Sequence, residues 1–141
     1  MDIFIQPLET SVKRLLNESQ LISSDLTPEH LRYFFGLGTK EEPEGVVGLE
    51  LFGTVGLLRS LAVVSSRRRT GLGSKLVAHA EDYARNKGIK SLYLLTNTAE
   101  AFFKHRGYKR TGRDDAPLAI RETKEFSEIS PVSSAFMVKH L

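Results

Sequence analysis

The stretch LAVVSSRRRTGLGSKL, residues 61–76, decides the fold that this sequence predicts. It begins with four apolar residues at 61–64, as a buried strand does. Residues 65–70 are polar and include three consecutive arginines. After Gly71-Leu72-Gly73, apolar residues recur every four positions, which is typical of one face of an amphipathic helix; they are Leu72, Leu76, Ala80 and Ala84. The stretch therefore predicts a strand, a basic turn with glycines and a long helix.

The turn within this stretch has the properties of an anion site. A helix N-terminus presents unpaired N–H groups, and its dipole favours negative charge. Glycines allow a bulky anion to approach the backbone. Two common phosphate loops do not fit, because Gly73 is followed by Ser74-Lys75 in the order opposite to a Walker loop, and Leu76 stands where a dinucleotide fingerprint needs glycine. The turn predicts a pyrophosphate site of another type.

The spacing of Arg68, Gly71 and Gly73 resembles the acyl-CoA loop of GNAT-type N-acetyltransferases, R/Q-x-x-G-x-G/A. The strand before the loop is also similar, although Arg69 stands where many members have glycine. The resemblance implies that acetyl-CoA lies along this strand and loop, on Leu61, Ala62, Val63, Arg68, Arg69, Thr70, Gly71, Leu72, Gly73 and Ser74.

A second segment, TNTAEAFFKHRGY at residues 96–108, is similar to the second CoA segment of the same family. Its matches are Ala99, Phe102, Gly107 and Tyr108, and they add Thr96, Ala99 and Phe102 to the implied CoA contacts. Two positions differ from the family pattern. Thr96 replaces an asparagine, and Phe103 replaces the tyrosine that in many members protonates the departing thiolate. The resemblance therefore leaves the general acid unassigned.

A finer resemblance is to N-acetyltransferases associated with arsenic resistance. It rests on these residues: Gly48-Leu49-Glu50, residues 57–63, Leu94-Leu95-Thr96, Thr98-Ala99, Phe102-Phe103, Pro117, Ile120, Glu125-Phe126 and Pro131. Members often carry cysteine before a late proline, whereas this chain has Ser130 before Pro131. This resemblance does not settle which amine is acetylated.

The family resemblance and the patterns along the chain predict one α/β (α+β) domain over residues 1–141, with a GNAT-like, mostly antiparallel central sheet flanked by helices on both faces. The expected strands cover residues 2–8, 31–37, 46–52, 57–64, 90–97, 108–111 and 133–141. The expected helices are one capped by Thr10 or Ser11, a short one at Thr27-Pro28-Glu29, one over 71–87 ended by Gly88, one over 99–106 and one starting at Asp114-Asp115.

Composition restricts the class of protein further. The absence of cysteine excludes thiolate nucleophiles and cysteine metal sites, and no histidines have metal-ligand spacing, so no metal is expected. No signal or membrane-spanning segment is apparent, so we expect a cytoplasmic protein with no membrane partner. Residues 65–110 hold 11 basic and 3 acidic side chains, a net charge of +8, within a chain of net charge +3. Nucleic acid would suit such a surface, but stacking aromatics are not interleaved with the basic residues, so we expect none to bind.

Glu50 and Arg59 are the candidate catalytic residues, because they are two opposite charges on otherwise apolar strands. A hairpin centred on Thr54-Val55 would place them opposite each other. In one interpretation they form a structural ion pair. In the other, Glu50 deprotonates the amine while Arg59 binds a substrate carboxylate. The sequence leaves both open.

The function predicted from these features is transfer of an acetyl group from acetyl-CoA to the amine of a small, amino-acid-like substrate. We expect a backbone N–H beside residues 61–63 to stabilise the developing oxyanion. Two alternatives remain, a catalytically silent acyl-CoA-binding module and a protein or peptide N-acetyltransferase. The expected assembly is a monomer or a homodimer.

Overall fold

The computed structural model describes residues 2–129 and 134–141. The strands are β1 (Ile3–Ile5), β2 (Phe34–Gly38), β3 (Pro43–Phe52), β4 (Val55–Val63), β5 (Ser91–Thr96), β6 (Lys109–Arg110) and β7 (Ala135–His140). The helices are α1 (Glu9–Glu18), α2 (Pro28–Leu31), α3 (Leu72–Asn86), α4 (Glu100–His105) and α5 (Leu118–Arg121). In these residues no helix is long and apolar enough to cross a membrane.

The strands form one seven-stranded sheet in the order β1-β2-β3-β4-β5-β7-β6. The pairs β1–β2, β2–β3, β5–β7 and β6–β7 are antiparallel. Strands β4 and β5 pair in parallel, with Val55 opposite Ser91 and Leu57 opposite Tyr93. Parallel neighbours need a crossover, and α3 supplies it. The predicted mixed, mostly antiparallel α/β fold is confirmed.

The chain divides into two compact units, each described here by itself. The first comprises Met1–Glu50 and Leu58–Tyr83, and the second comprises Leu51–Leu57 and Ala84–Leu141. Strands β3 and β4 contribute residues to both units. The single domain expected over residues 1–141 stays a prediction.

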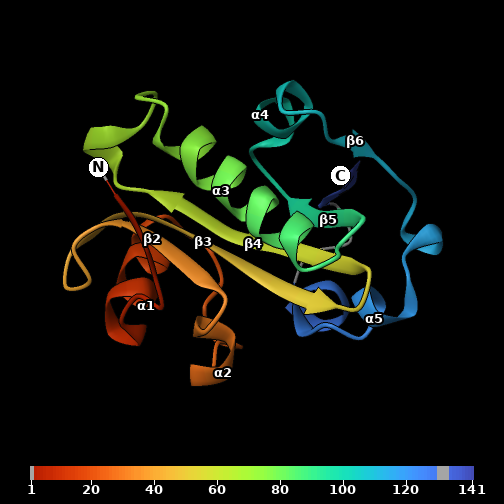
Figure 1. The fold of residues 1–141 in the computed structure, drawn as a ribbon, viewed down its shortest axis with the longest axis horizontal. Helices are drawn as coiled ribbons and strands as arrows, with labels where there is room; N and C mark the ends of the chain where they lie inside the picture. The colour runs from red at the N-terminus through yellow and green to blue at the C-terminus, as the bar shows by residue number, and fades with distance from the viewer. Residues whose placement is uncertain (1, 130–133) are drawn as a thin grey trace. The chain divides into compact units, whose positions relative to one another are not determined.

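The core of the first unit lies on both faces of its strands, because neighbouring residues of a strand point to opposite faces. On one face Phe34 packs with the apolar side of α1, which includes Val12 and Leu16. On the other face the ring of Phe35 contacts Tyr83 of α3, at 5.0 Å between centroids. Figure 1 shows α1, β2 to β4 and the long helix α3.

The second unit is held together by a cluster of aromatic and aliphatic side chains. Phe136 of β7 stacks on Tyr93 of β5 at 5.4 Å and meets Phe126 edge-on at 5.3 Å. Buried Ile120 of α5 belongs to the same cluster.

Two ionisable groups of the second unit have a shifted pKa. Burial raises the pKa of the Tyr93 phenol above its ordinary value, and the nearby Asp115 carboxylate adds a smaller effect in the same direction. Arg110, through a hydrogen bond, lowers the pKa of Glu100 to about 2.

Two predicted helix starts are wrong. The first helix begins at Glu9 with Leu8 as N-cap, because Ser11 instead donates its hydroxyl to the carbonyl oxygen of Glu41 at 2.8 Å. The segment at Asp114-Asp115 is a single 3₁₀ turn, and α5 starts only after Pro117, whose fixed φ and missing N–H suit a helix entrance.

The other expected elements are present with shifted ends. The third strand begins at Pro43, three residues earlier than expected, because the bend that precedes it covers only residues 40–42. Strand β7 begins at Ala135. The expected start of this strand at Ser133 lies outside the described residues, as do Ser130 and Pro131.

Candidate active site

The predicted pyrophosphate loop is a compact turn that leads into α3. After β4 ends at Val63, a 3₁₀ turn covers Ser65–Arg67, and the helix begins at Leu72. Arg69 and Gly71 lie in the left-handed region, with φ of 64° and 88°. The Arg68 side chain folds back and donates from Nε to the carbonyl oxygen of Val63 at 3.1 Å. The loop is therefore anchored to the strand that precedes it.

The backbone of this loop fits an anionic group. Among the described residues, no backbone hydrogen bond is found for the N–H groups of residues 69–74, which surround the start of α3. Arg68, Arg69, Thr70 and Gly71 are exposed. Free N–H donors at a helix N-terminus, next to guanidinium groups, are the chemistry that a pyrophosphate needs.

The second CoA segment belongs to the other compact unit. Thr96 ends β5, and its hydroxyl accepts the N–H of Ala99 at 3.0 Å, which turns the chain into α4. The Phe102 side chain is partly exposed, so it can still contact a ligand. The candidate CoA residues thus lie in both units: 61–63 and 68–74 in the first, and Thr96, Ala99 and Phe102 in the second.

Phe103, at the position where the family pattern has tyrosine, is a packing residue. It is 6% exposed, and its ring meets Phe102 at 5.0 Å and Tyr108 at 5.5 Å, both edge-on. A ring in this environment stabilises the fold and supplies no proton.

We expect Phe103→Leu to lower the free energy of unfolding by about 1–3 kcal/mol, because a smaller side chain leaves a gap beside two rings. Turnover per folded molecule should stay within about twofold, and Phe103→Tyr should keep or raise it. Chemical denaturation and initial rates check this. A well-folded Phe103→Leu protein with a large specific loss of turnover would contradict the assignment.

The two candidate catalytic residues form part of a larger charged cluster in the first unit. Arg59 donates from one terminal nitrogen to Oε2 of Glu50 at 2.9 Å. The same guanidinium binds Asp25 in a two-pronged contact, at 2.5 Å to Oδ2 and 2.8 Å to Oδ1. Its Nε donates to the Ser60 hydroxyl at 3.0 Å. One buried cation therefore holds two carboxylates from different parts of the chain.

Burial separates the roles of these side chains. The side chains of Arg59 and Asp25 are 1% and 3% exposed, whereas that of Glu50 is 14% exposed. Although burial raises the pKa of Asp25, the hydrogen bond and charge of Arg59 outweigh it and hold that pKa below its ordinary value. Arg59 thus binds the buried carboxylate of Asp25, a residue of the same chain. The interpretation in which Arg59 binds a substrate carboxylate does not fit this geometry.

The backbone around Arg59 departs from a regular strand. Ser60, the next residue, has a φ of 58°, which is uncommon for a residue other than glycine. The burial pattern of β4 also stops alternating, with Gly56 to Arg59 all buried. Such a distortion re-aims side chains and occurs often beside functional sites. In this chain the distortion lies directly after Arg59, whose side chain points into the charged cluster.

His30 is the fourth member of the cluster. It lies on α2, and its Nε2 is 3.8 Å from Oε1 of Glu50. Ligand-type atoms of Asp25, His30 and Glu50 all lie within 4.8 Å of one another. The guanidinium of Arg59 already bonds both carboxylates, so a metal ion would have to displace a buried cation. The group fits proton transfer better than metal binding.

The sequence model of the acetyltransferase (GNAT) family matches residues 3–108, which is most of the chain and includes the loop and this cluster. The chain belongs to the acetyltransferase (GNAT) family.

Relatives of this GNAT chain include an uncharacterized N-acetyltransferase of Chlorobaculum tepidum, 35% identical over 65% of the chain and 59% of the relative. An amino-acid acetyltransferase of Ralstonia nicotianae is 31% identical over 91% of the chain. The chain spans 28% of the length of that enzyme. The similarity to named amino-acid acetyltransferases thus concerns one part of longer proteins.

Solved structures share the GNAT fold. N-acetylglutamate synthase from Neisseria gonorrhoeae, complexed with coenzyme A and N-acetyl-glutamate, superposes with a TM-score of 0.80 at 23% identity, over 99% of this chain and 35% of that one. Rv2747 from Mycobacterium tuberculosis, in complex with CoA, has a TM-score of 0.78 at 16% identity, over 100% and 99% of the two chains. At these identities the likeness establishes the fold.

The hairpin of β3 and β4, which carries Glu50 and Arg59, has its turn at a different position from the predicted one. The turn is at Gly53-Thr54, one residue earlier than expected, and Val55 already belongs to β4. The ion pair between Glu50 and Arg59, one of the two interpretations of these residues, is nevertheless present.

Asp25 and His30 were missed by the sequence reasoning. Asp25 is 34 positions from Arg59, in the connection between α1 and α2. Arg59 itself was a usable signal that a second carboxylate is needed. A buried guanidinium has five N–H donors, and one carboxylate cannot accept hydrogen bonds from all of them. His30 gave a weaker signal, since it occupies the third helical position, where a capping box usually has glutamate or glutamine.

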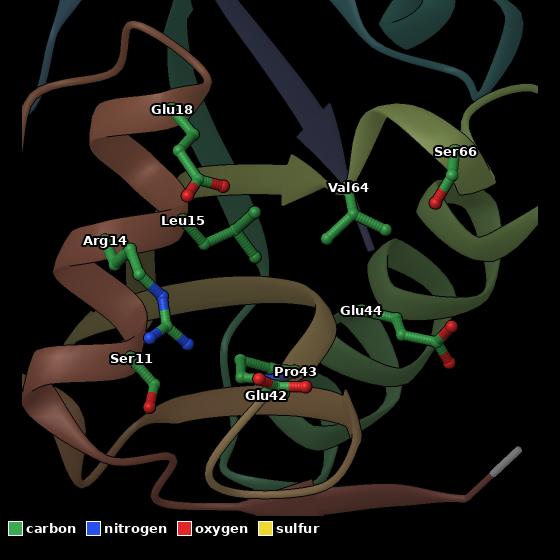
Figure 2. A pocket seen from close by; sticks show the side chains of 9 residues that line it. All are labelled: Ser11, Arg14, Leu15, Glu18, Glu42, Pro43, Glu44, Val64 and Ser66. Atoms are coloured by element: carbon green, nitrogen blue, oxygen red, sulfur yellow. The ribbon is translucent and has the colours of Figure 1, made fainter.

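A pocket of about 450 Å³ lies elsewhere in the first unit. Its walls come from α1, from the start of β3 and from residues 64 and 66 after the strand β4 (Figure 2). Arg14 and three glutamates, Glu18, Glu42 and Glu44, give it mixed charge. None of the residues predicted to contact CoA lines it, but Val64 and Ser66 belong to the same turn between β4 and α3 as the predicted pyrophosphate loop.

Proposed function

We propose that this chain is an acetyl-CoA-dependent N-acetyltransferase that acts on the amine of a small, amino-acid-like compound. The observation that carries the proposal is a partly exposed carboxylate, Glu50, held by a buried guanidinium in a chain of the GNAT family. Loop geometry that fits a pyrophosphate supports the donor, and amino-acid acetyltransferase relatives support the acceptor class.

Acetyl-CoA would supply the acetyl group as a reactive thioester. In this chain the N–H groups of residues 69–74 would bind its pyrophosphate, and residues 61–63 would lie along the pantetheine. An ammonium group must lose a proton before it can attack a carbonyl carbon. Glu50 would take that first proton, which leaves a neutral amine. The amine nitrogen would then bond to the carbonyl carbon of the thioester as the C–S bond breaks, so that CoA leaves as the thiolate, and the second proton would pass from the nitrogen to the thiolate or to solvent.

The geometry narrows how the acceptor binds. Because Arg59 is internal, the partly exposed charged group that the cluster presents is the Glu50 carboxylate, next to His30. This surface suits an ammonium group, so any acid group of the substrate would bind elsewhere. The finer resemblance to arsenic-resistance acetyltransferases makes arsenical and phosphinic amino acids specific candidates.

A catalytically silent CoA-binding module is the second candidate, and one observation favours it. Phe103 is buried where the family pattern places an acidic phenol. A thiolate is a good leaving group, and solvent can protonate it after departure. Acetyl transfer therefore does not require a phenol at position 103.

A steady-state assay separates these functions. Release of free CoA is measured with a panel of standard, arsenical and phosphinic amino acids, with peptides of the same residues as a second panel, and products are identified by mass spectrometry. We expect turnover with at least one free amino acid and little with peptides. CoA binding without acetylation of any amine would favour the silent module, and preference for peptides would favour a peptide acetyltransferase.

The loop assignment is tested by a pair of isosteric variants at Gly71. A Cβ at this position would meet nothing within 4 Å, and asparagine and aspartate tolerate positive φ better than most residues. We expect Gly71→Asp to weaken CoA binding by about tenfold or more, equivalent to 1.4 kcal/mol, because it places a carboxylate beside the pyrophosphate. Gly71→Asn has nearly the same shape without the charge and should bind CoA much more tightly than Gly71→Asp.

Calorimetry at two salt concentrations measures both variants. The gap between Gly71→Asp and Gly71→Asn should narrow as salt rises, because salt screens exposed charges. Equal CoA affinity of the two variants would show that the pyrophosphate binds elsewhere.

A further inference from the structure

His30 has two ring nitrogens in different environments, and these environments assign its proton. The backbone N–H of Thr27 donates to Nδ1 at 3.1 Å, as part of the capping box at the start of α2. The hydroxyl of Thr27 also lies 3.0 Å from Nδ1. A backbone N–H can only donate, so Nδ1 must offer its lone pair. The proton of the neutral imidazole is therefore on Nε2.

The protonated nitrogen faces the carboxylate that the proposed function uses. Nε2 of His30 lies 3.8 Å from Oε1 of Glu50, while Arg59 donates to Oε2 of the same carboxylate. The two oxygens of Glu50 thus have different neighbours, a fixed donor on one side and an imidazole N–H on the other. The charged groups around His30 are Glu50 from β3, Asp25 from the α1–α2 connection and Arg59 from β4.

We propose that His30 is a positioning residue for acetyl transfer, whose Nε2–H orients Oε1 of Glu50 toward the incoming amine. The inference rests on the proposed function of Glu50. The separation of 3.8 Å is longer than a hydrogen bond, and contacts of this kind often tighten only when substrate binds. Movement of the Glu50 side chain by about 1 Å closes it.

This arrangement makes His30 a donor and excludes a role as a proton relay. A relay would require Nε2 to accept the proton that Glu50 removes, and Nε2 already carries one. Moving that proton to Nδ1 would set two donors, Nδ1–H and the Thr27 N–H, against each other. The start of α2 therefore fixes both the tautomer and the chemical role of the imidazole.

The tautomer can be measured without any substrate. Two-dimensional NMR of the ¹⁵N-labelled protein distinguishes a protonated from an unprotonated imidazole nitrogen by its chemical shift. We expect Nε2–H for His30 at neutral pH, and an Nδ1–H tautomer would overturn the proposal. His105, which is exposed on α4, serves as the reference signal and is assigned through its own substitution.

The kinetic test compares His30→Gln with His30→Ala. Glutamine at this helix position completes a capping box through its amide oxygen, so His30→Gln should fold as the unaltered protein does. His30→Ala loses the side-chain half of the capping box and should unfold at a lower urea concentration. The amide nitrogen of glutamine can still donate to Glu50, whereas alanine has no donor. We therefore expect His30→Ala to lower kcat about tenfold with little change in the KM for the amine, and His30→Gln to keep most of the activity.

The pH profile separates positioning from a structural role. A hydrogen bond to the charged form of a carboxylate favours that form. Loss of the Nε2–H donor in His30→Ala should therefore move the acidic limb of kcat, which reports the substrate complex, to higher pH, whereas His30→Gln keeps a donor and should change it little. His105→Gln is the matched control, with an unchanged profile expected. A folded His30→Ala protein with unaltered kcat and an unaltered acidic limb would refute the proposal.

Parallel assay of Glu50→Gln keeps the two hypotheses apart. If Glu50→Gln retains full activity, the proposed role of Glu50 is wrong, and the inference about His30 falls with it. If Glu50→Gln is inactive while His30→Ala behaves as the unaltered protein, only the positioning role of His30 is refuted.

Discussion

Replacement of Glu50 by glutamine is expected to lower kcat about 100-fold or more, because a positioned general base contributes roughly 10²–10⁴-fold. Glutamine keeps the size of the side chain and its acceptor oxygen for Arg59, but it cannot take a proton. The acidic limb of the rate profile should disappear as well. CoA affinity should change little, since the loop at residues 68–74 is not altered.

The control for this result is Glu29→Gln. Glu29 is an exposed carboxylate on α2, with a side chain 75% exposed, and it pairs only with Arg32 among the contacts described. The same chemical change at this position should leave kcat and the pH profile unaltered. Unchanged turnover in a folded Glu50→Gln protein, on the best amine found, would show that the charged cluster is structural and that another group removes the proton.

Replacement of Arg59 by methionine is expected to lower the free energy of unfolding by about 3–5 kcal/mol. The substitution removes the cation that lies between two carboxylates, and Asp25 is left buried without its main partner. Arg32→Met is the control, because its ion pair with Glu29 is exposed and such pairs contribute about 0–1 kcal/mol. Urea denaturation of both proteins measures the difference.

The pH dependence of this loss follows from Asp25. Arg59 keeps the pKa of Asp25 below its ordinary value of 3.8, although burial acts in the opposite direction. The stabilisation is therefore complete above pH 3.8 and is lost as the pH falls through the lower, folded-state pKa. Without Arg59, the burial of Asp25 is no longer offset by that cation, and burial favours the neutral form of the Asp25 carboxyl group. The stability gap between the unaltered protein and Arg59→Met should accordingly narrow on acidification.

A double-mutant cycle identifies the partner that carries the effect. Arg59→Met and Asp25→Asn should be non-additive by about 0.5–3 kcal/mol, as residues in contact are. Arg59→Met combined with Glu29→Gln should be additive. Additivity in the first cycle would mean that the Asp25–Arg59 contact does not hold the cluster together.

The local elements could be predicted from sequence because their causes are local. The capping box at Thr27, the apolar run before residue 65 and the four-residue apolar spacing after it each depend on neighbours within one or two turns. The structure confirms α2, β4 and α3 close to their expected ends. The wrong helix starts at Ser11 and Asp114 arose where a capping-type residue found a different hydrogen bond or turn.

The candidate site could be predicted only in part. The Glu50–Arg59 pair follows from one hairpin, in which a short turn fixes which side chains share a face. The loop at residues 68–74 follows from glycine spacing and its position before a helix. Burial of Phe103 and the distortion at Ser60 depend on what packs around them, and no local pattern specifies that.

Sequence alone thus determined the strand–turn–helix of the anion loop, the mixed fold and one charged pair. The tertiary structure alone decided that the pair is a cluster, by bringing Asp25 and His30 to Arg59 and Glu50. Side chains this far apart in the chain meet only when the α1–α2 connection packs against the sheet, and that packing results from the whole apolar core of the first unit. A charge in a sequence shows that a partner is needed, whereas only the folded chain shows which residue that partner is.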